Sequence, residues 1–198
     1  MNELIVNIIV GLLLSLSAGV RMTLPLLGMC LLAQLNIVHL PENMDWLASD
    51  ASLIILVIAA IAETVIHFIP AAGTALKAAV TPLAFMAGTL LMAVPLEGHN
   101  PLHQWAFAAV VGGSSAALMH LSVVGSRVIA APANMASLGI LSIVWNAGEM
   151  LFSIALAVLA MICSVEGWVI GAVSLFAIGT FMLIVLTKIM LARHERET

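Results

Sequence analysis

Four ionisable side chains lie inside long apolar stretches of the sequence: Arg21, Glu63, Arg127 and Glu149. Placing one charge at the centre of a membrane helix costs about 2.5–3.5 kcal/mol on insertion scales. Such side chains therefore need partners or water, and we expect Arg21 to pair with Glu63 and Arg127 to pair with Glu149. Charged residues within a membrane often mark the path of a substrate or ion, but buried ion pairs can also do no more than fix helix packing.

Three further polar residues accompany these charges. His67 follows Glu63 by four residues and Asn146 precedes Glu149 by three, so each shares a helix face with its glutamate. His120 lies in the same apolar segment as Arg127. A neutral histidine beside a carboxylate can move protons, although it can equally be a packed hydrogen-bonding residue. The candidate substrate- or ion-binding residues are therefore Arg21, Glu63, His67, His120, Arg127, Asn146 and Glu149.

The composition predicts an integral membrane protein. The chain has 198 residues, of which 63% are hydrophobic and 8% charged, and its mean hydropathy is +1.21. Soluble domains carry about 25% charged residues. The apolar runs are unbroken and close to the roughly 20 residues that a helix needs to cross a bilayer, unlike the alternating pattern of a β-barrel strand. We therefore predict an all-α polytopic bundle, with residues 1–198 forming a single membrane domain.

Several other classes of protein lack support in the sequence. The net charge is −4, and no basic cluster indicates nucleic-acid binding. The two cysteines and twelve methionines show no metal-binding spacing, so we expect no metal and no cofactor. No GxSxG, HExxH, P-loop or GxGxxG motif is present. We therefore do not expect an enzyme.

Six apolar segments follow one another along the chain. The first is too long for a simple span and has a glycine two residues before Arg21 and a proline four after it, so we expect it to be tilted or broken near Gly19 to Pro25. The segments run over about 4–35, 51–69, about 76–94, about 101–131, about 137–163 and about 168–191.

The charges between the segments predict an orientation. The connections that carry Glu42, Glu97 and Glu166 contain no Lys or Arg, whereas Lys77 lies in another connection and Arg193 near the C-terminus. With six spans, the three acidic connections fall on one side, and the Lys77 connection and both termini fall on the other. The positive-inside rule then places both termini in the cytoplasm of a cell whose inner membrane holds the protein.

The two halves of the chain share a pattern, which indicates a repeat over about 1–97 and 98–198. "LSAGVRMTLP" in the first segment and "LSVVGSRVIAAP" in the fourth each place a glycine two residues before an arginine and a proline soon after it. Glu63 and Glu149 each lie about twelve residues into the next segment, which places both near the bilayer midplane. Because three spans per copy is an odd number, the second copy would be inverted, as in many transporters.

At these residues the chain resembles a family of small polytopic membrane proteins known as domain of unknown function 4126. The resemblance lies in "SAGVRMTLPLL", in Glu63 with the later Pro70, in "TPLAFMAG", in His120 with Arg127, and in Glu149. It implies the polytopic architecture and no particular activity. The chain departs from the family pattern where His67 and Phe68 replace an Asp-Lys pair and where Thr81 replaces a basic residue, so any ligand bound there in relatives would be bound differently here.

Two functions fit these observations. The first is a small transporter or channel for a small polar solute or ion, in which the paired Arg and Glu form a midplane site. The second is a non-transporting accessory or assembly protein whose buried pairs are structural. For either function we expect the protein to lie in the lipid bilayer and not to bind nucleic acid. Either function is also compatible with a homo-oligomer.

Overall fold

All the regular structure of the described chain is helical, as the sequence predicted. A computed structural model describes residues 3–68, 80–98, 100–136 and 140–166. In chain order the elements are α1 (Glu3–Val20), α2 (Thr23–Gln34), the 3₁₀-helix η1 (Glu42–Ala48), α3 (Asp50–Phe68), α5 (Thr81–Ala93), the 3₁₀-helix η2 (Val94–Leu96), α6 (Pro101–Phe107), the π-helix η3 (Ala108–Gly113), α7 (Ser114–Ala136) and α8 (Ile140–Glu166).

The described helices include three that are long and apolar enough to cross a membrane. These are Glu3–Val20, Pro101–Pro132 and Ile143–Cys163, and η1 with α3 gives a fourth if that pair, bent by 61°, counts as one span. The sequence predicted six spans. The predicted sixth segment, 168–191, lies outside the described residues, and the third is represented by the shorter helix Thr81–Leu96. The described part therefore suggests a membrane protein and gives three or four candidate spans.

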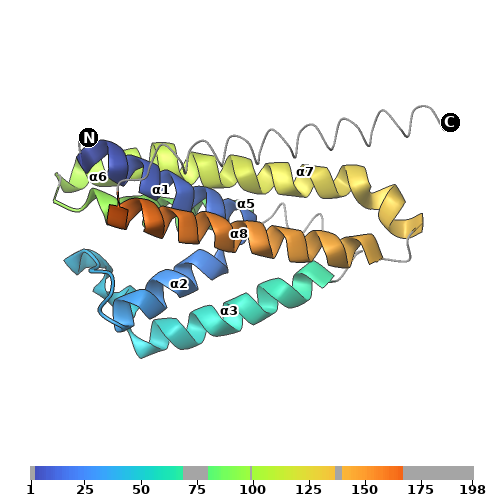
Figure 1. Cartoon of the computed structure of the whole chain (residues 1–198), viewed down its shortest axis with the longest axis horizontal. Coiled ribbons are helices and arrows are strands. Elements are labelled where there is room, and N and C mark those ends of the chain that lie inside the picture. The colour runs from blue at the N-terminus through green and yellow to red at the C-terminus, as the bar shows by residue number, and fades with distance from the viewer. Residues whose placement is uncertain (1–2, 69–79, 99, 137–139, 167–198) are drawn as a thin grey trace.

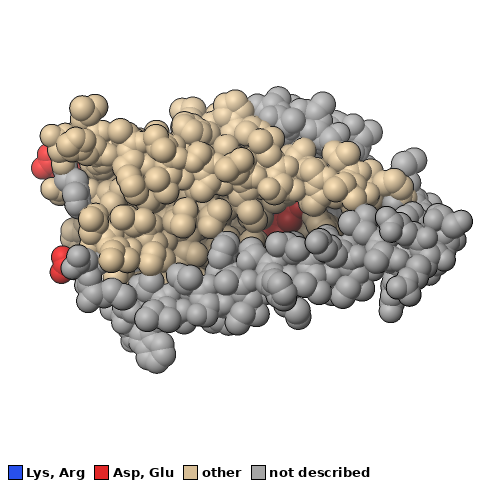
Figure 2. All heavy atoms as spheres, turned by 90° about the horizontal axis from the view of Figure 1, so that it is seen from above, with Lys and Arg blue, Asp and Glu red and all other residues tan. Residues whose placement is uncertain are grey.

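The outer surface of the bundle is apolar. Ile54, Ile55, Ile58 and Ile61 form an exposed stripe along α3, and exposed aliphatic side chains also cover α7 and α8. Figure 2 shows a face whose described part is almost uncharged, with acidic side chains at one end and another in a hollow partway along. Water would oppose the exposure of so much apolar surface, whereas lipid tails accept it.

The first apolar segment is broken where the sequence predicted it. α1 ends at Val20 and α2 begins at Thr23, and Figure 1 shows α2 running back toward the end of the bundle at which α1 begins. Pro25 explains the position of the break, because in a continuous helix its ring would clash with the carbonyl group of Arg21 and it has no amide hydrogen to donate. As the third residue of α2 it needs no helical donor.

The matching segment in the second half is continuous. Gly125, Arg127 and Pro132 all lie within α7, and Pro132 is an internal proline of that helix. The first helix of each half was predicted to be broken or long, and in the second half it is long, since the apolar helical stretch runs over Pro101–Pro132. The irregularity of this segment lies earlier, in η3, where the helix widens for one turn.

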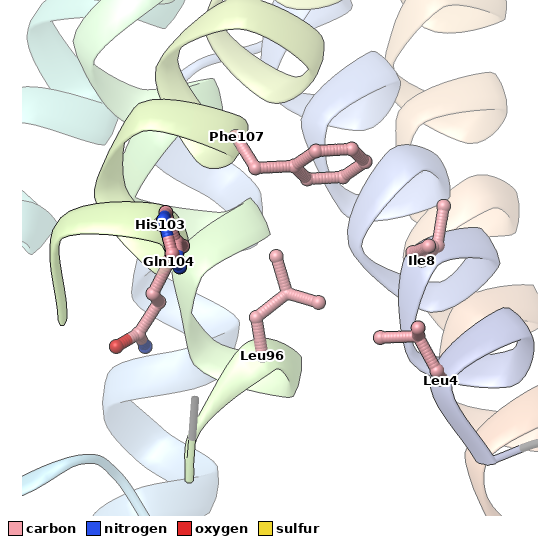
Figure 3. Close-up of a pocket in the computed structure, with 6 residues that line it drawn as sticks. All are labelled: Leu4, Ile8, Leu96, His103, Gln104 and Phe107. Atoms are coloured by element: carbon pink, nitrogen blue, oxygen red, sulfur yellow. The ribbon is translucent and has the colours of Figure 1, made fainter. Parts of the chain in front are cut away.

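The N-terminal end of α1 lies at a different end of the bundle from the one that the sequence predicted. Leu4 and Ile8 line a small apolar pocket of about 180 Å³ together with Leu96, His103, Gln104 and Phe107 (Figure 3). The first turn of α1 thus lies at the same end of the bundle as the connection that carries Glu97. The six-span scheme placed the N-terminus at the opposite end, and it fails here because the first segment turns back instead of crossing.

Glycines allow α1, α5 and η3 to pack closely in the core. An added Cβ at Gly112 would lie 2.7 Å from the carbonyl oxygen of Gly88, and one at Gly88 would lie equally close to that of Gly112. The hydroxyl oxygen of Ser15 on α1 lies 2.8 Å from the carbonyl oxygen of Gly88. Gly88 and Gly112 therefore allow α5 and η3 to approach closely.

We predict that Gly112→Ala destabilises the protein by about 1–3 kcal/mol, because the new methyl group must push α5 away from η3. Gly125→Ala is the matched control, since an added Cβ there meets nothing described within 4 Å and alanine favours a helix. Thermal unfolding in detergent measures both variants. Equal melting temperatures for the two variants would contradict the close contact.

Candidate functional site

The four predicted charges converge at the break between α1 and α2. Arg21 lies in the break itself, and its charge interacts with those of Glu63, Glu149 and Arg127. Arg21 is 3% exposed and Glu63 is 9% exposed, while the side chains of Arg127 and Glu149 are 12% and 8% exposed. In Figure 1 the break lies partway along α7 and α8, away from both ends of the bundle.

Glu63 binds the N-terminus of α2. The backbone amide of Met22 donates to Oε1 at 3.2 Å and that of Thr23 to Oε2 at 3.1 Å, and the Thr23 hydroxyl also donates to Oε2. In a continuous helix these two amides would bond to the carbonyl groups of Ala18 and Gly19. The carboxylate thus replaces two lost helical bonds at the positive end of a helix, where a negative charge is stabilised.

His120 of α7 binds the other side of the break. Its Nδ1 lies 3.2 Å from the carbonyl oxygen of Gly19. Because that carbonyl can only accept, Nδ1 must carry the hydrogen. Gly19 permits this approach, since an added Cβ would lie 2.5 Å from the carbonyl oxygen of Ala116.

Arg127 and Glu149 form a buried ion pair between α7 and α8. Arg127 Nε donates to Glu149 Oε1 at 2.8 Å, and Nη2 donates to Glu149 Oε2 and to Asn146 Oδ1, the latter at 2.6 Å. This bidentate arrangement is among the strongest interactions that a guanidinium and a carboxylate form. The structure therefore brings together this predicted pair and Asn146.

Arg21 and Glu63, predicted to pair, influence each other electrostatically. The described hydrogen bonds of Glu63 go to Met22 and Thr23, and Arg21 acts on the carboxylate electrostatically. Arg21 Nε is buried and has no hydrogen-bond partner among the described residues.

Three polar residues that lie near the break were not among the candidates predicted from the sequence. Thr23 contacts Glu63, and Ser17 of α1 and Ser153 of α8 bond each other reciprocally, with hydroxyl oxygens 3.0 Å apart. Helical spacing contained a clue, because Ser17 precedes Arg21 by four residues and Ser153 follows Glu149 by four. The side chain of His67 lies outside the described part, and no group of metal-ligating side chains occurs within the described ranges.

Comparison with known proteins gives a family. The model of the domain of unknown function DUF4126 matches residues 8–185. The chain belongs to this family. The matched residues include the break between α1 and α2 and the four charged residues Arg21, Glu63, Arg127 and Glu149. These four residues and the break form the polar centre of the bundle, which therefore lies wholly within the DUF4126 region. Neither a curated protein nor a solved structure matches the chain, and the description of DUF4126 assigns no activity.

We predict strong coupling between Arg127 and Glu149. Arg127→Met or Glu149→Leu alone should cost about 3–5 kcal/mol, because each leaves a buried charge without its partner, whereas the double variant should recover most of that loss. Chemical unfolding of the four proteins in detergent micelles provides the double-mutant cycle. Additive losses would mean that the two residues do not form the pair described above.

Proposed function

We propose that this DUF4126 protein is a small transporter or channel of the cell's inner membrane, which moves a small polar solute or ion through the polar centre of the bundle. The observation that carries the proposal is the gathering of Arg21, Glu63, Arg127 and Glu149 around a broken helix in a bundle with an apolar surface.

The free-energy cost of burying these charges and the broken helix supports a binding site at the polar centre. Four charges at membrane depth would cost roughly 10 kcal/mol if isolated, and a broken helix adds backbone groups that hydrocarbon cannot satisfy. Broken helices at membrane depth occur where backbone groups bind substrate or line a hydrated cavity. The two positive and two negative charges nearly cancel, which suits a zwitterion, a small polar solute or an anion.

One pair of described helices supports an inverted repeat. α3 and α8, which carry Glu63 and Glu149, run in opposite directions in Figure 1, as corresponding helices of inverted copies would. We orient the bundle with Lys77 and the connection after α7 toward the cytoplasm. The beginning of α1 then faces the other side, together with the connection that carries Glu97.

One observation favours the alternative, a non-transporting accessory or assembly protein. Arg127 is satisfied by Glu149 and Asn146 together, as expected of a pair that fixes the register of α7 on α8. In that case the polar centre would hold the bundle together, and a partner would be met within the membrane.

Flux through liposomes tests the proposal. The full chain is reconstituted, and proton-coupled flux is measured for a panel of small solutes and ions, first for the wild type and then for Glu63→Gln. We expect wild-type flux that this variant loses while remaining folded, because the amide cannot take up a proton or carry the charge. Glu97→Gln is the matched control, since Glu97 is exposed at the end of the bundle and should leave flux unchanged. No flux across the panel would favour the alternative.

A further inference from the structure

The place that Glu63 occupies is built as a site for an anion. Three donors converge on its carboxylate, namely the amides of Met22 and Thr23 and the Thr23 hydroxyl. They stand at the N-terminus of α2, a helix of twelve residues whose positive end favours negative charge. Such a set of donors would bind a free carboxylate, formate for example, as it binds this one.

Arg21 provides a second and independent observation. The residue is 3% exposed, and its Nε is buried and has no hydrogen-bond partner among the described residues. Leaving a buried donor unpaired costs about 1–3 kcal/mol, and more when the group is charged. Arg21 directly precedes Met22, whose amide binds Glu63, so the residue with the free donor is the chain neighbour of the site.

The charge count favours an anion over a cation. Arg127 and Glu149 neutralise each other in direct contact. Among the described groups at this place, Arg21, the helix end and Glu63 remain, and they amount to a net charge of about +0.5 if the helix end carries half a unit. A cation at this place would meet a guanidinium and the hydrogen ends of amides. An anion would meet donors, of which Arg21 Nε is still unused.

We propose that the N-terminus of α2 and Arg21 form a binding site for a small monoanion, and that Glu63 occupies this site as an internal competitor. The anion binds when the Glu63 carboxylate withdraws, and the carboxylate returns when the anion leaves. The inference rests on the proposed function, since it names the chemical class of substrate that the same polar centre takes.

Binding of sodium formate to the purified full chain in detergent tests the inference. Calorimetric titration is carried out on the wild type, Glu63→Ala, and Glu63→Ala combined with Arg21→Gln. Removing the competitor should tighten formate binding at least about tenfold, equivalent to about 1.4 kcal/mol, and removing Arg21 as well should abolish that gain. Glu97→Ala, which removes an exposed carboxylate at the end of the bundle, is the control and should not gain this binding.

A second arm keeps the test decisive if the Arg21 variant does not fold. Glu63→Ala combined with Thr23→Val removes one donor and should weaken formate binding relative to Glu63→Ala. Replacing sodium by choline at constant formate should change nothing. If Glu63→Ala gains no formate binding, or if binding follows the cation, the carboxylate is merely a helix cap and the inference fails.

The outcomes separate this inference from the proposed transport. Formate binding with the expected dependence on Glu63 and Arg21, but without flux in liposomes, would support the anion site and overturn transport. Flux of a neutral or cationic solute together with no anion binding would support transport and overturn the anion site.

Discussion

A helix that ends inside an apolar bundle leaves amides and carbonyl groups without their helical partners, and hydrocarbon offers no water to replace them. Between α1 and α2 this demand is met by side chains from two other helices. Glu63 accepts from the amides of Met22 and Thr23, and His120 binds the carbonyl group of Gly19. The break therefore ties α3 and α7 to the first segment and fixes where the polar centre lies.

Arg127 and Arg21 differ in their hydrogen bonding and in their burial. Arg127 donates hydrogen bonds to the Glu149 carboxylate and the Asn146 side-chain amide on α8, as expected of a residue that stabilises helix packing. Arg21 is more deeply buried, and within the described part of the chain its Nε has no hydrogen-bond partner. If the polar centre has a working part, this asymmetry places it beside Arg21 and the N-terminus of α2. The Arg127–Glu149 pair then serves as its support.

Much of the architecture and part of the site followed from the sequence. The unbroken apolar runs gave the helical class, Pro25 gave the break, and the buried charges gave the Arg127–Glu149 pair. The partner of Glu63 could not be predicted, because it depends on backbone amides that exist as free donors only after the break has formed. The end of the fourth segment was predicted at residue 131, but α7 continues past Pro132 to Ala136, because local sequence does not show whether packing will offset the proline. The direction of α2 was equally hidden, because a break does not reveal the angle at which the chain continues.

The distance between the two ends of the first segment tests the broken helix most directly. Spin labels at Leu4→Cys and Leu35→Cys, both exposed positions, are introduced in a chain whose buried cysteines, Cys30 and Cys163, are changed to alanine. A segment that turns back at Arg21 should give a distance of about 30 Å or less by pulsed electron resonance, since the two helices differ in rise by only about 9 Å. A continuous helix would give about 47 Å, and that result would contradict the account.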